Sequence, residues 1–408
     1  MWEQIRINKR NSIVLLMSMA TVLFALGAVI GYAWIGPQGA GMGLLIAASV
    51  WLVLTLISFS SGDQILLASS GAVEVTSEVH PMLFNIVEEM KIAAALPAMP
   101  KIYIIPDPSP NAFATGRSPQ HAAVAVTEGL LAKLNRDELQ GVIAHEVSHI
   151  VHRDILFITL AGVMLGAVAL LSNVFLRGSL YGGSHRRYSG RSGSGGAQMI
   201  IVLIALLLAI LAPLMVQILY FALSRKREYL ADAGAVRLTR YPEGLANALE
   251  KIAGTRIPVA AANKVTAPMY IANPFRGEEA NLFSTHPPMQ ERIEILRKMA
   301  YGAAYKDYDN AYQNVTGRAG VMPASALRET ESVPPYSAAQ TSTPSVPQAE
   351  TKAQQHIRIG DFIRQTQGFT FIACPCGVKL KLPPNLRTDK VMCPRCKKIH
   401  ELPTETNN

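Results

Sequence analysis

The segment AHEVSHIVHRD, residues 144–154, holds three histidines within eight residues. His145 and His149 are four residues apart, so on a helix they share a face with Cβ atoms about 6 Å apart, and both imidazoles can reach one zinc ion. Glu146 lies beside them and can accept a proton from a water molecule on that zinc. The HExxH pattern on a helix therefore predicts a catalytic zinc site, with His145 and His149 as ligands and Glu146 as general base.

A solvated helix face rich in His and Glu is the alternative explanation of this pattern. The neighbouring positions favour burial instead, because they are apolar: Val142, Ile143, Val147 and Ile150. His152 falls on nearly the same face as His145, but about 10 Å further along the helix axis. Because no glycine breaks the helix, we expect it to run straight into the following apolar segment. Three histidines in line on one straight helix cannot surround one ion, so His152 is not expected to bind the metal.

The third zinc ligand must then come from another helix, and the segment EYLAD, residues 228–232, is the best candidate. Glu228 and Asp232 are four residues apart and share a helix face. Glu228 can therefore bind the zinc while Asp232 orients a ligand histidine. An exposed acidic pair that balances the preceding SRKR is the alternative.

Four long stretches lack charged residues and are apolar enough to cross a bilayer. The first run, from Asn11 to Gly62, is divided by the turn GPQG at 36–39 and predicts two helices, which are too long for a cleaved signal peptide. Two further spans are predicted at about 155–176 and 199–223. Two crossings between HExxH and EYLAD return the chain to the same side of the membrane, which favours the zinc role of the second motif.

The distribution of basic residues predicts which side of the membrane the site faces. The net charge is +9, and the chain before the first span contains Arg6, Lys9 and Arg10, whereas the turn between the first two spans has no charge. This asymmetry predicts a multi-pass protein of the cell (inner) membrane whose active site faces the cytoplasm. The loop 177–198 opposes this orientation, because it carries four arginines and should face outward. Since the basic residues are dispersed, nucleic acid is not an expected partner.

The rest of the chain predicts one α+β domain and a small C-terminal unit. Residues 63–304 carry an amphipathic helix in HPMLFNIVEEMKIAAAL, three strands in KIYII, NAFATGR and HAAVAV, and a helix capped by Asn135 and Glu138 that contains HExxH. With residues 1–62 as the first two spans, the expected fold is a mainly α membrane protein with four transmembrane helices and a zincin-type metallopeptidase domain. Residues 305–366, rich in Pro, Ser, Thr, Ala and Gln, predict a flexible linker.

All four cysteines lie in the last unit, residues 367–404, in the motifs CPCG and CPRC: Cys374, Cys376, Cys393 and Cys396. Four thiolates between short strands are typical of a small β zinc ribbon, which is a closed structural site. Because the first pair is CxC and not CxxC, His400 is an alternative ligand. A disulfide is disfavoured for cysteines that face the cytosol. The unit is basic, and nothing in its sequence names a partner.

Four motifs occur in this order along the chain: NAFATG, AHEVSHIVHRD, SRKREYLADAGA and STHPPMQERI. Their order resembles that of HtpX-like membrane zinc endopeptidases, relatives of the CaaX prenyl proteases. The chain resembles this family from residue 1 to about Tyr301. The resemblance implies a gluzincin site, with Glu146 as general base and three zinc ligands: His145, His149 and Glu228.

The resemblance also implies roles for residues outside the zinc ligands. An edge strand that binds an extended peptide is matched by four consecutive residues, Asn111, Ala112, Phe113 and Ala114, although an ordinary core strand is the alternative. His286 matches a histidine near the zinc that would stabilise the oxyanion, and Arg292 matches an arginine that supports the cleft. From the residues alone, THPP at 285–288 is equally consistent with a helix start capped by His286.

Together these features predict a membrane-embedded zinc-dependent endopeptidase. It would hydrolyse peptide bonds of misfolded or membrane proteins at the cytosolic face, in protein quality control. Two zinc ions are expected, one catalytic and one structural in the ribbon, and the expected partners are polypeptide substrates and the lipid bilayer. The alternative is an adaptor that keeps the zinc fold without cleaving and whose ribbon binds a protein or a nucleic acid. The intact Glu146 argues against it.

Overall fold

The computed structural model of the chain describes residues 2–156, 225–260, 262, 267–274, 287–299, 302–328, 352–384, 386, 388 and 390–401. Several predictions lie outside these residues. They are the third membrane span beyond residue 156, the fourth span, the arginine-rich loop and His286.

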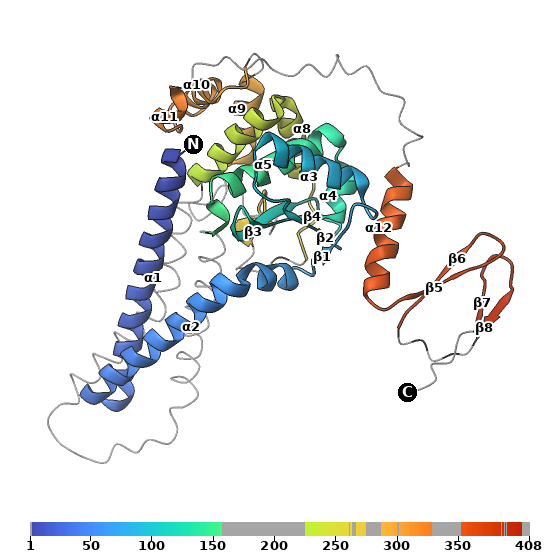
Figure 1. Cartoon of the computed structure of the whole chain (residues 1–408), viewed down its shortest axis with the longest axis horizontal. Coiled ribbons are helices and arrows are strands. Elements are labelled where there is room, and N and C mark those ends of the chain that lie inside the picture. The colour runs from blue at the N-terminus through green and yellow to red at the C-terminus, as the bar shows by residue number, and fades with distance from the viewer. Residues whose placement is uncertain are drawn as a thin grey trace.

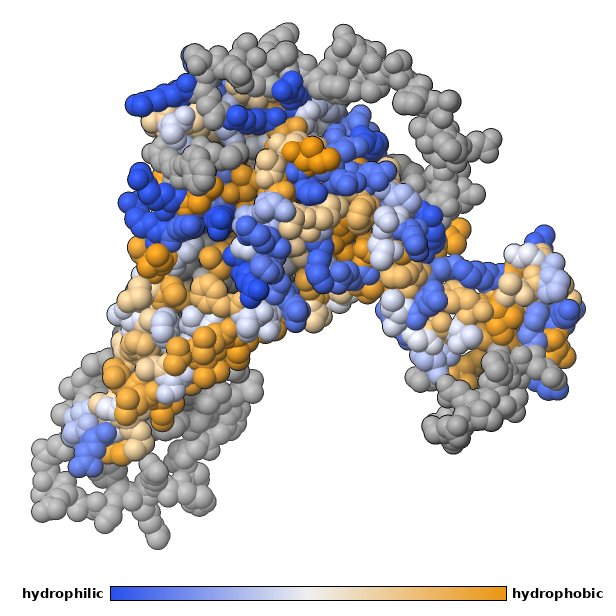
Figure 2. Space-filling view, viewed as in Figure 1, coloured by the Kyte–Doolittle hydropathy of each residue, from blue (hydrophilic) through white to orange (hydrophobic). Residues whose placement is uncertain are grey.

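The first two helices form a long hairpin that extends away from the α+β domain (Figure 1). α1 (Trp2–Ile35) and α2 (Pro37–Ser69) are joined by Gly36, whose φ of 87° is readily adopted by glycine. Their most apolar windows have mean hydropathies of 2.6 and 2.3, and both helices are long enough to cross a membrane. The predicted pair of apolar helices is confirmed, and apolar side chains cover much of its visible surface (Figure 2).

Glycines let the two helices of this hairpin approach each other closely. A Cβ added to Gly31 would lie 2.1 Å from the carbonyl oxygen of Gly39, and one added to Gly27 would lie 2.7 Å from that of Gly43. Such contacts between small residues are typical of packed transmembrane helices, because they bring the backbones together. The two helices are therefore packed as one unit.

The described strands of the α+β domain form a four-stranded sheet in the order β1-β2-β4-β3. They are β1 (Val73–Glu74), β2 (Lys101–Ile105), β3 (Ala112–Ser118) and β4 (His121–Thr127). β2 and β4 are parallel, and the other two pairs are antiparallel. The strands predicted from KIYII, NAFATGR and HAAVAV are confirmed, and β3 lies at an edge of the sheet.

Helices pack around this sheet and build the core that holds the site. In chain order they are α3 (Pro81–Ala93), α4 (Glu128–Lys133), α5 (Arg136–Val151), a helical segment at 225–239, α8 (Pro242–Ala253), the 3-10 turn η1 (Ala267–Met269), α9 (Met289–Lys298), α10 (Tyr305–Thr316) and α11 (Ala324–Leu327). Twelve of the 16 residues of α5 are buried, HExxH among them. The alternative of a solvated helix face is therefore wrong.

Local interactions fix both ends of α5. At its start the Asn135 side chain accepts a hydrogen bond from the Glu138 N–H at 2.9 Å, and the Glu138 carboxylate accepts one from the Asn135 N–H at 2.8 Å, which is the predicted capping box. At its end His152 caps the helix, and Arg153 adopts a positive φ of 60°. The prediction of a helix that runs straight into the next apolar segment is therefore wrong. The chain turns at Arg153, and Asp154 folds back over the last turn.

The predicted linker, 305–366, is helical at both ends, so this prediction is wrong there. α10 buries Tyr308 in the core of the domain, and α12 (Lys352–Thr366) buries Ile359 against the same core. Their polar composition concealed these helices, because a helix needs only a narrow stripe of apolar residues to pack. The middle of the predicted linker, 329–351, lies outside the described residues.

Beyond α12 the chain forms two small antiparallel sheets (Figure 1). They pair β5 (Thr370–Ala373) with β6 (Lys379–Leu382) and β7 (Lys390–Met392) with β8 (Ile399–Glu401). The Asp361 carboxylate on α12 lies 2.7 Å from Lys381 Nζ and 3.1 Å from Lys379 Nζ. These two ion pairs connect the first of the sheets to α12.

Candidate metal centre

Three predicted ligands converge between two helices. His145 and His149 belong to α5, Glu228 belongs to the helix 225–239, and each is at most 5% exposed. The two histidine Nε2 atoms are 3.2 Å apart, and the Glu228 carboxylate oxygens lie 3.7 and 3.5 Å from them. One ligand atom from each residue lies within 4.8 Å of the others. Two imidazole nitrogens and one carboxylate form a donor set of catalytic zinc, with a fourth position left for water or substrate.

The charges around the two histidines favour a cation at this point. Burial lowers the pKa of His149, but the carboxylates of Asp154 and Glu228 outweigh that effect and raise it to about 10. Burial also lowers the pKa of His145, and there it outweighs the opposing effect of Asp232. One imidazole therefore attracts a positive charge while its neighbour stays neutral. A metal ion, which binds neutral imidazoles, can take the place of that proton.

A carboxylate orients each histidine through the other ring nitrogen. His145 Nδ1 lies 2.9 Å from Asp232 Oδ1, and His149 Nδ1 lies 3.1 Å from Asp154 Oδ2. With Nδ1 as the donor in both rings, both Nε2 atoms are available to a metal. The sequence predicts Asp232 in this role. It does not predict Asp154, which reaches His149 because of the turn at Arg153.

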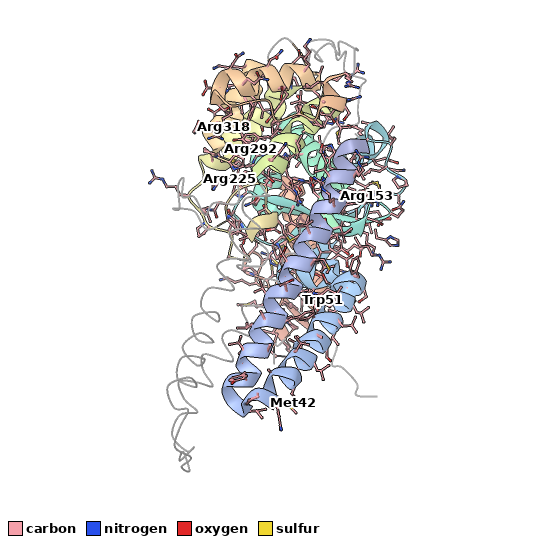
Figure 3. All side chains as sticks on the ribbon, turned by 90° about the vertical axis from the view of Figure 1, so that its left-hand side faces the viewer. Met42, Trp51, Arg153, Arg225, Arg292 and Arg318 are labelled. Carbon is pink, nitrogen blue, oxygen red and sulfur yellow. The ribbon has the colours of Figure 1, made fainter. Side chains whose placement is uncertain are left out.

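Arg292 on α9, labelled in Figure 3, is fully buried and holds Asp232 beside His145. Its Nε donates to Oδ2 at 2.8 Å and its Nη2 to Oδ1 at 2.7 Å, a two-point contact. Its Nη1 donates to the Ile271 carbonyl at 3.0 Å and lies 3.3 Å from a Glu228 oxygen. Burial would raise the pKa of Asp232, but the guanidinium outweighs it and lowers that pKa. Arg292 therefore keeps Asp232 charged and fixed.

Glu146 lies beside the converging ligands with its carboxylate buried. Burial raises the pKa of this carboxyl to about 8, although the charge of His149 and the backbone N–H of Ala114 oppose the shift. A carboxylate whose pKa is raised by burial is a stronger base than an exposed one, which suits a group that must take a proton from water. The geometry and the electrostatics therefore agree with the predicted role of a general base.

Two of the four residues predicted to bind substrate hold a neighbouring segment. The Asn111 side chain donates to the Ala272 carbonyl at 3.0 Å, and the Ala112 carbonyl accepts from the Ile271 N–H at 2.9 Å. Both residues are fully buried. The Ile271 carbonyl in turn accepts a hydrogen bond from Arg292. Asn111 and Ala112 therefore help to position Arg292 by holding segment 271–272.

Ala114 is the residue of β3 whose backbone faces Glu146. Residues alternate along a strand, so its N–H points away from β4, as the Ala112 carbonyl does. That N–H lies close enough to lower the pKa of Glu146. Phe113, between them, packs its ring on Tyr270 with centroids 5.1 Å apart. The edge of the sheet thus brings one backbone donor next to the candidate base.

Close packing between α5 and the helix 225–239 keeps the ligands in register. A Cβ on Gly234 would lie 2.5 Å from Ser148 Oγ. We expect Gly234→Ala to separate the helices, to destabilise the protein by about 1–3 kcal/mol, and to weaken zinc binding. Thermal unfolding and chelator competition measure the two effects. Gly254→Ala is the matched control, because its Cβ would come no closer than 3.4 Å to a neighbour, and equal losses in both variants would contradict the packing argument.

His152 is not part of the ligand group, as the sequence predicts. It caps α5 and is 5% exposed. Burial lowers its pKa to about 4, so the ring is neutral at physiological pH. His152 therefore contributes a packed imidazole at the end of the helix.

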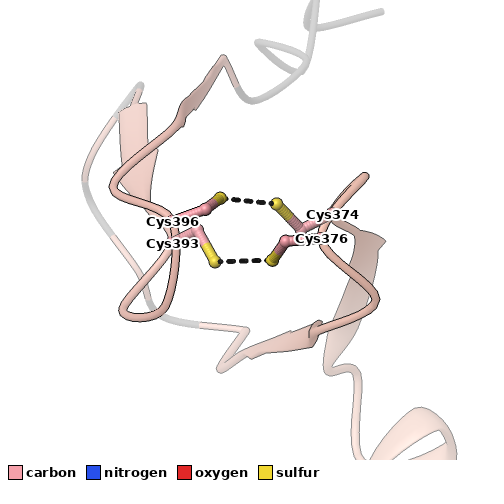
Figure 4. A group of neighbouring side chains, drawn as sticks. All are labelled: Cys374, Cys376, Cys393 and Cys396. Atoms are coloured by element: carbon pink, nitrogen blue, oxygen red, sulfur yellow. Dashed lines mark hydrogen bonds between the residues drawn. The ribbon is translucent and has the colours of Figure 1, made fainter.

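The four cysteines form a second cluster of potential ligands (Figure 4). The Sγ atoms of Cys374 and Cys396 are 3.4 Å apart, and those of Cys376 and Cys393 are 3.5 Å apart. All four are free thiols, since a disulfide bond would bring the sulfurs to about 2 Å. His400 does not belong to this group. Four thiols at one point match the donor set of a closed zinc site.

Comparisons with known proteins agree with this geometry. Residues 77–300 match Peptidase family M48. A protein named Protease HtpX homolog from Dictyoglomus thermophilum is 45% identical over 299 residues, which are 73% of this chain and 94% of that protein. Proteins of the same name from Ligilactobacillus salivarius and Listeria monocytogenes are 43% and 44% identical over 300 and 307 residues, each covering 73% of this chain and 100% of the relative.

A solved structure is also similar to this chain. The crystal structure of S. mikatae Ste24p matches 72% of this chain and 67% of its own at 18% identity, with a TM-score of 0.39.

The region that matches the family contains HExxH, EYLAD and Arg292. The relatives that align over nearly their whole length are named as proteases. An adaptor that does not cleave is therefore not favoured, and the two long apolar helices agree with a membrane protein. The chain belongs to peptidase family M48 and is a membrane zinc metalloprotease.

Proposed function

We propose that His145, His149 and Glu228 hold the catalytic zinc and that Glu146 is the general base. The observation that carries this proposal is the convergence of three ligand atoms within 4.8 Å, from two helices, beside a buried carboxylate. The orienting carboxylates on both histidines support it, because they leave both Nε2 atoms available as ligands.

The proposed reaction is hydrolysis of a peptide bond. A zinc ion held by these ligands supplies a Lewis acid and lowers the pKa of a water molecule to near 7. Glu146 accepts a proton from the water that attacks the carbonyl carbon, and it then donates that proton to the leaving amine. Asp232 and Arg292 keep His145 in position throughout. His286, which lies outside the described residues, is proposed to stabilise the oxyanion.

The substrate is proposed to bind as an extended chain along the edge of β3. The outward N–H of Ala114 can donate to a substrate carbonyl, in the manner of strand addition to a sheet. Such backbone pairing would place the peptide next to Glu146 without selecting particular side chains. This mode suits a protease that acts on unfolded segments of many sequences.

We propose that membrane proteins and misfolded chains near the bilayer are the substrates. Asn8 on α1 contacts the turn that follows HExxH, and the apolar part of α1 begins at Ile13, five residues later. At 1.5 Å per residue, Asn8 lies about 7.5 Å from the apolar segment along the helix axis. A site so close to the bilayer favours substrates that are anchored there, as in protein quality control.

The proposed orientation places this site at the cytoplasmic face of the inner membrane, in a protein with four spans. Arg6, Lys9 and Arg10 flank Asn8 in the sequence, so the site and the basic end of α1 share one side. Short basic segments beside a span stay in the cytosol. Protease accessibility of a tag at residue 1 in sealed vesicles tests the orientation.

We also propose that the four cysteines hold a structural zinc, so that the full chain contains two zinc ions. Replacing Cys374 and Cys396 with Ser is expected to remove one ion and leave the other. His149→Ala is expected to remove the other ion and abolish cleavage, because it deletes one of three ligands. Elemental analysis of the purified chains gives the counts. One zinc in the unaltered chain would refute one of the two sites, and the variants would show which.

A further inference from the structure

Asn8 connects the first membrane helix directly to the turn that follows HExxH. It lies on α1 and is 1% exposed. Its side-chain Nδ2 donates to Asp154 Oδ1 at 2.7 Å and to the His152 carbonyl at 2.9 Å. In Figure 3, Arg153, the residue between these two acceptors, lies beside the same part of α1. One amide group thus holds both sides of the turn.

Asp154 connects Asn8 to the proposed zinc ligand His149. Its Oδ2 lies 3.1 Å from His149 Nδ1, while its Oδ1 takes the bond from Asn8 and lies 3.6 Å from Arg227 Nε. Because the two oxygens of a carboxylate lie in one rigid plane, fixing Oδ1 also fixes the direction of Oδ2. A hydrogen bond on one oxygen therefore determines how His149 is held through the other.

The turn itself depends on this amide. The carbonyl of His152 lies at the end of α5, where carbonyls have no partner within the helix. Arg153 turns the chain with a positive φ, which is unfavourable for a residue other than glycine. The bond from Asn8 satisfies the carbonyl at this point. Without it, the turn and the position of Asp154 would be less well fixed.

We propose that Asn8 is a positioning residue of the catalytic zinc site, which acts through Asp154 on His149. This inference rests on the proposed zinc ligands. It makes the first transmembrane helix a part of the metal centre and not only an anchor. A shift of α1 relative to the domain would therefore weaken the hold on His149.

Zinc affinity of the full chain in detergent tests the proposal through chelator competition. Outer partners of metal-binding histidines typically change affinity 10- to 100-fold. We expect Asn8→Leu, which has similar size but no donor, to weaken binding at the catalytic site about tenfold. Asn8→Asp, which has the same shape but places a carboxylate against Asp154, should weaken it at least as much. The ribbon zinc should be unaffected in both.

Ser12→Ala is the matched control. Ser12 lies one turn further along α1, is also buried, and donates to the Asn8 carbonyl of its own helix at 2.8 Å. Among the described residues, its side chain makes no hydrogen bond to the turn after α5. This variant should bind zinc as the unaltered chain does, and a tenfold loss in Ser12→Ala would show that any disturbance of α1 has the same effect.

A double-mutant cycle separates positioning from packing. In an Asp154→Ala chain, Asn8→Leu should cause no further loss of zinc affinity, because the connecting carboxylate is gone. An equal loss in both backgrounds would overturn the proposal, as would unchanged affinity in both Asn8 variants. If Asn8→Leu does not fold, the isosteric Asn8→Asp enters the cycle in its place. If the unaltered chain binds no zinc at His145 and His149, the proposed zinc site itself is refuted. That result differs from failure of the Asn8 proposal, in which the unaltered chain binds zinc and the Asn8 variants bind it equally well.

Discussion

Replacing Glu146 with Gln is expected to lower kcat/KM for an unfolded protein substrate by a factor of about 10²–10⁴. Gln has the same shape, so α5 and its packing should be retained. Its amide, however, cannot accept the proton of the attacking water. Because Glu146 is not among the three converging ligands, the zinc content should stay at the value of the unaltered chain. Initial cleavage rates in detergent and metal analysis of the same sample measure both quantities.

His149→Ala is the comparison variant that separates loss of the general base from loss of the zinc. It should lose cleavage together with the catalytic zinc, whereas Glu146→Gln should lose cleavage alone. Unchanged cleavage in Glu146→Gln would end the peptidase mechanism proposed for this site. Loss of zinc in that variant would instead assign Glu146 a structural role.

Replacing Arg292 with Met is expected to destabilise the protein by about 3–5 kcal/mol, because breaking a buried ion pair leaves an uncompensated charge. Arg292 is fully buried and holds Asp232 through two hydrogen bonds of 2.8 and 2.7 Å. Met has a similar length, so the main loss is the charge that compensates Asp232. Zinc binding should weaken as well, since Asp232 orients His145. Denaturant unfolding and chelator competition measure these effects.

Arg297→Met provides the matched control on the same helix. Arg297 pairs with Glu250 at 2.6 Å, but the two side chains are 44% and 56% exposed, so the pair should contribute at most about 1 kcal/mol. Arg292→Lys should not recover the stability that is lost in Arg292→Met, because an ammonium group cannot make the same two-point contact. Equal losses in Arg292→Met and Arg297→Met would contradict the role of the buried pair.

Much of the candidate site could be predicted from local spacing in the sequence. Two residues four apart on a helix share a face, whatever the rest of the fold does, and this places His145 with His149 and Glu228 with Asp232. His152 falls on nearly the same face, but the rise of the helix puts it about 10 Å from His145 along the axis. It was therefore not expected to be a ligand, and it lies outside the converging group. The capping box at Asn135 and Glu138 was likewise visible in the sequence, because it depends on residues only three apart.

Predictions that depended on a chain direction or on a distant partner were less successful. The prediction that α5 continues straight is wrong because Arg153 adopts a positive φ. Neither the composition nor the periodicity of the sequence indicates this conformation. The flexible linker is wrong at its ends because α12 is stabilised by the domain it packs on, through Ile359. The partner of the Asn111 amide, the Ala272 carbonyl, lies 161 residues away in the chain, so local spacing could not predict that contact.

The chemistry of this protein can be predicted from its amino-acid sequence alone: a helix with HExxH, a second helix with EYLAD, two long apolar helices and four cysteines in two pairs. These features follow from helix periodicity and hydrophobicity, which act over a few residues. The groups that hold the ligands in place become visible only in the folded chain. Asp154 reaches His149 through a turn, and Asn8 reaches Asp154 across 146 residues. Such contacts arise because buried polar groups must find partners, and the partners are set by how the helices pack.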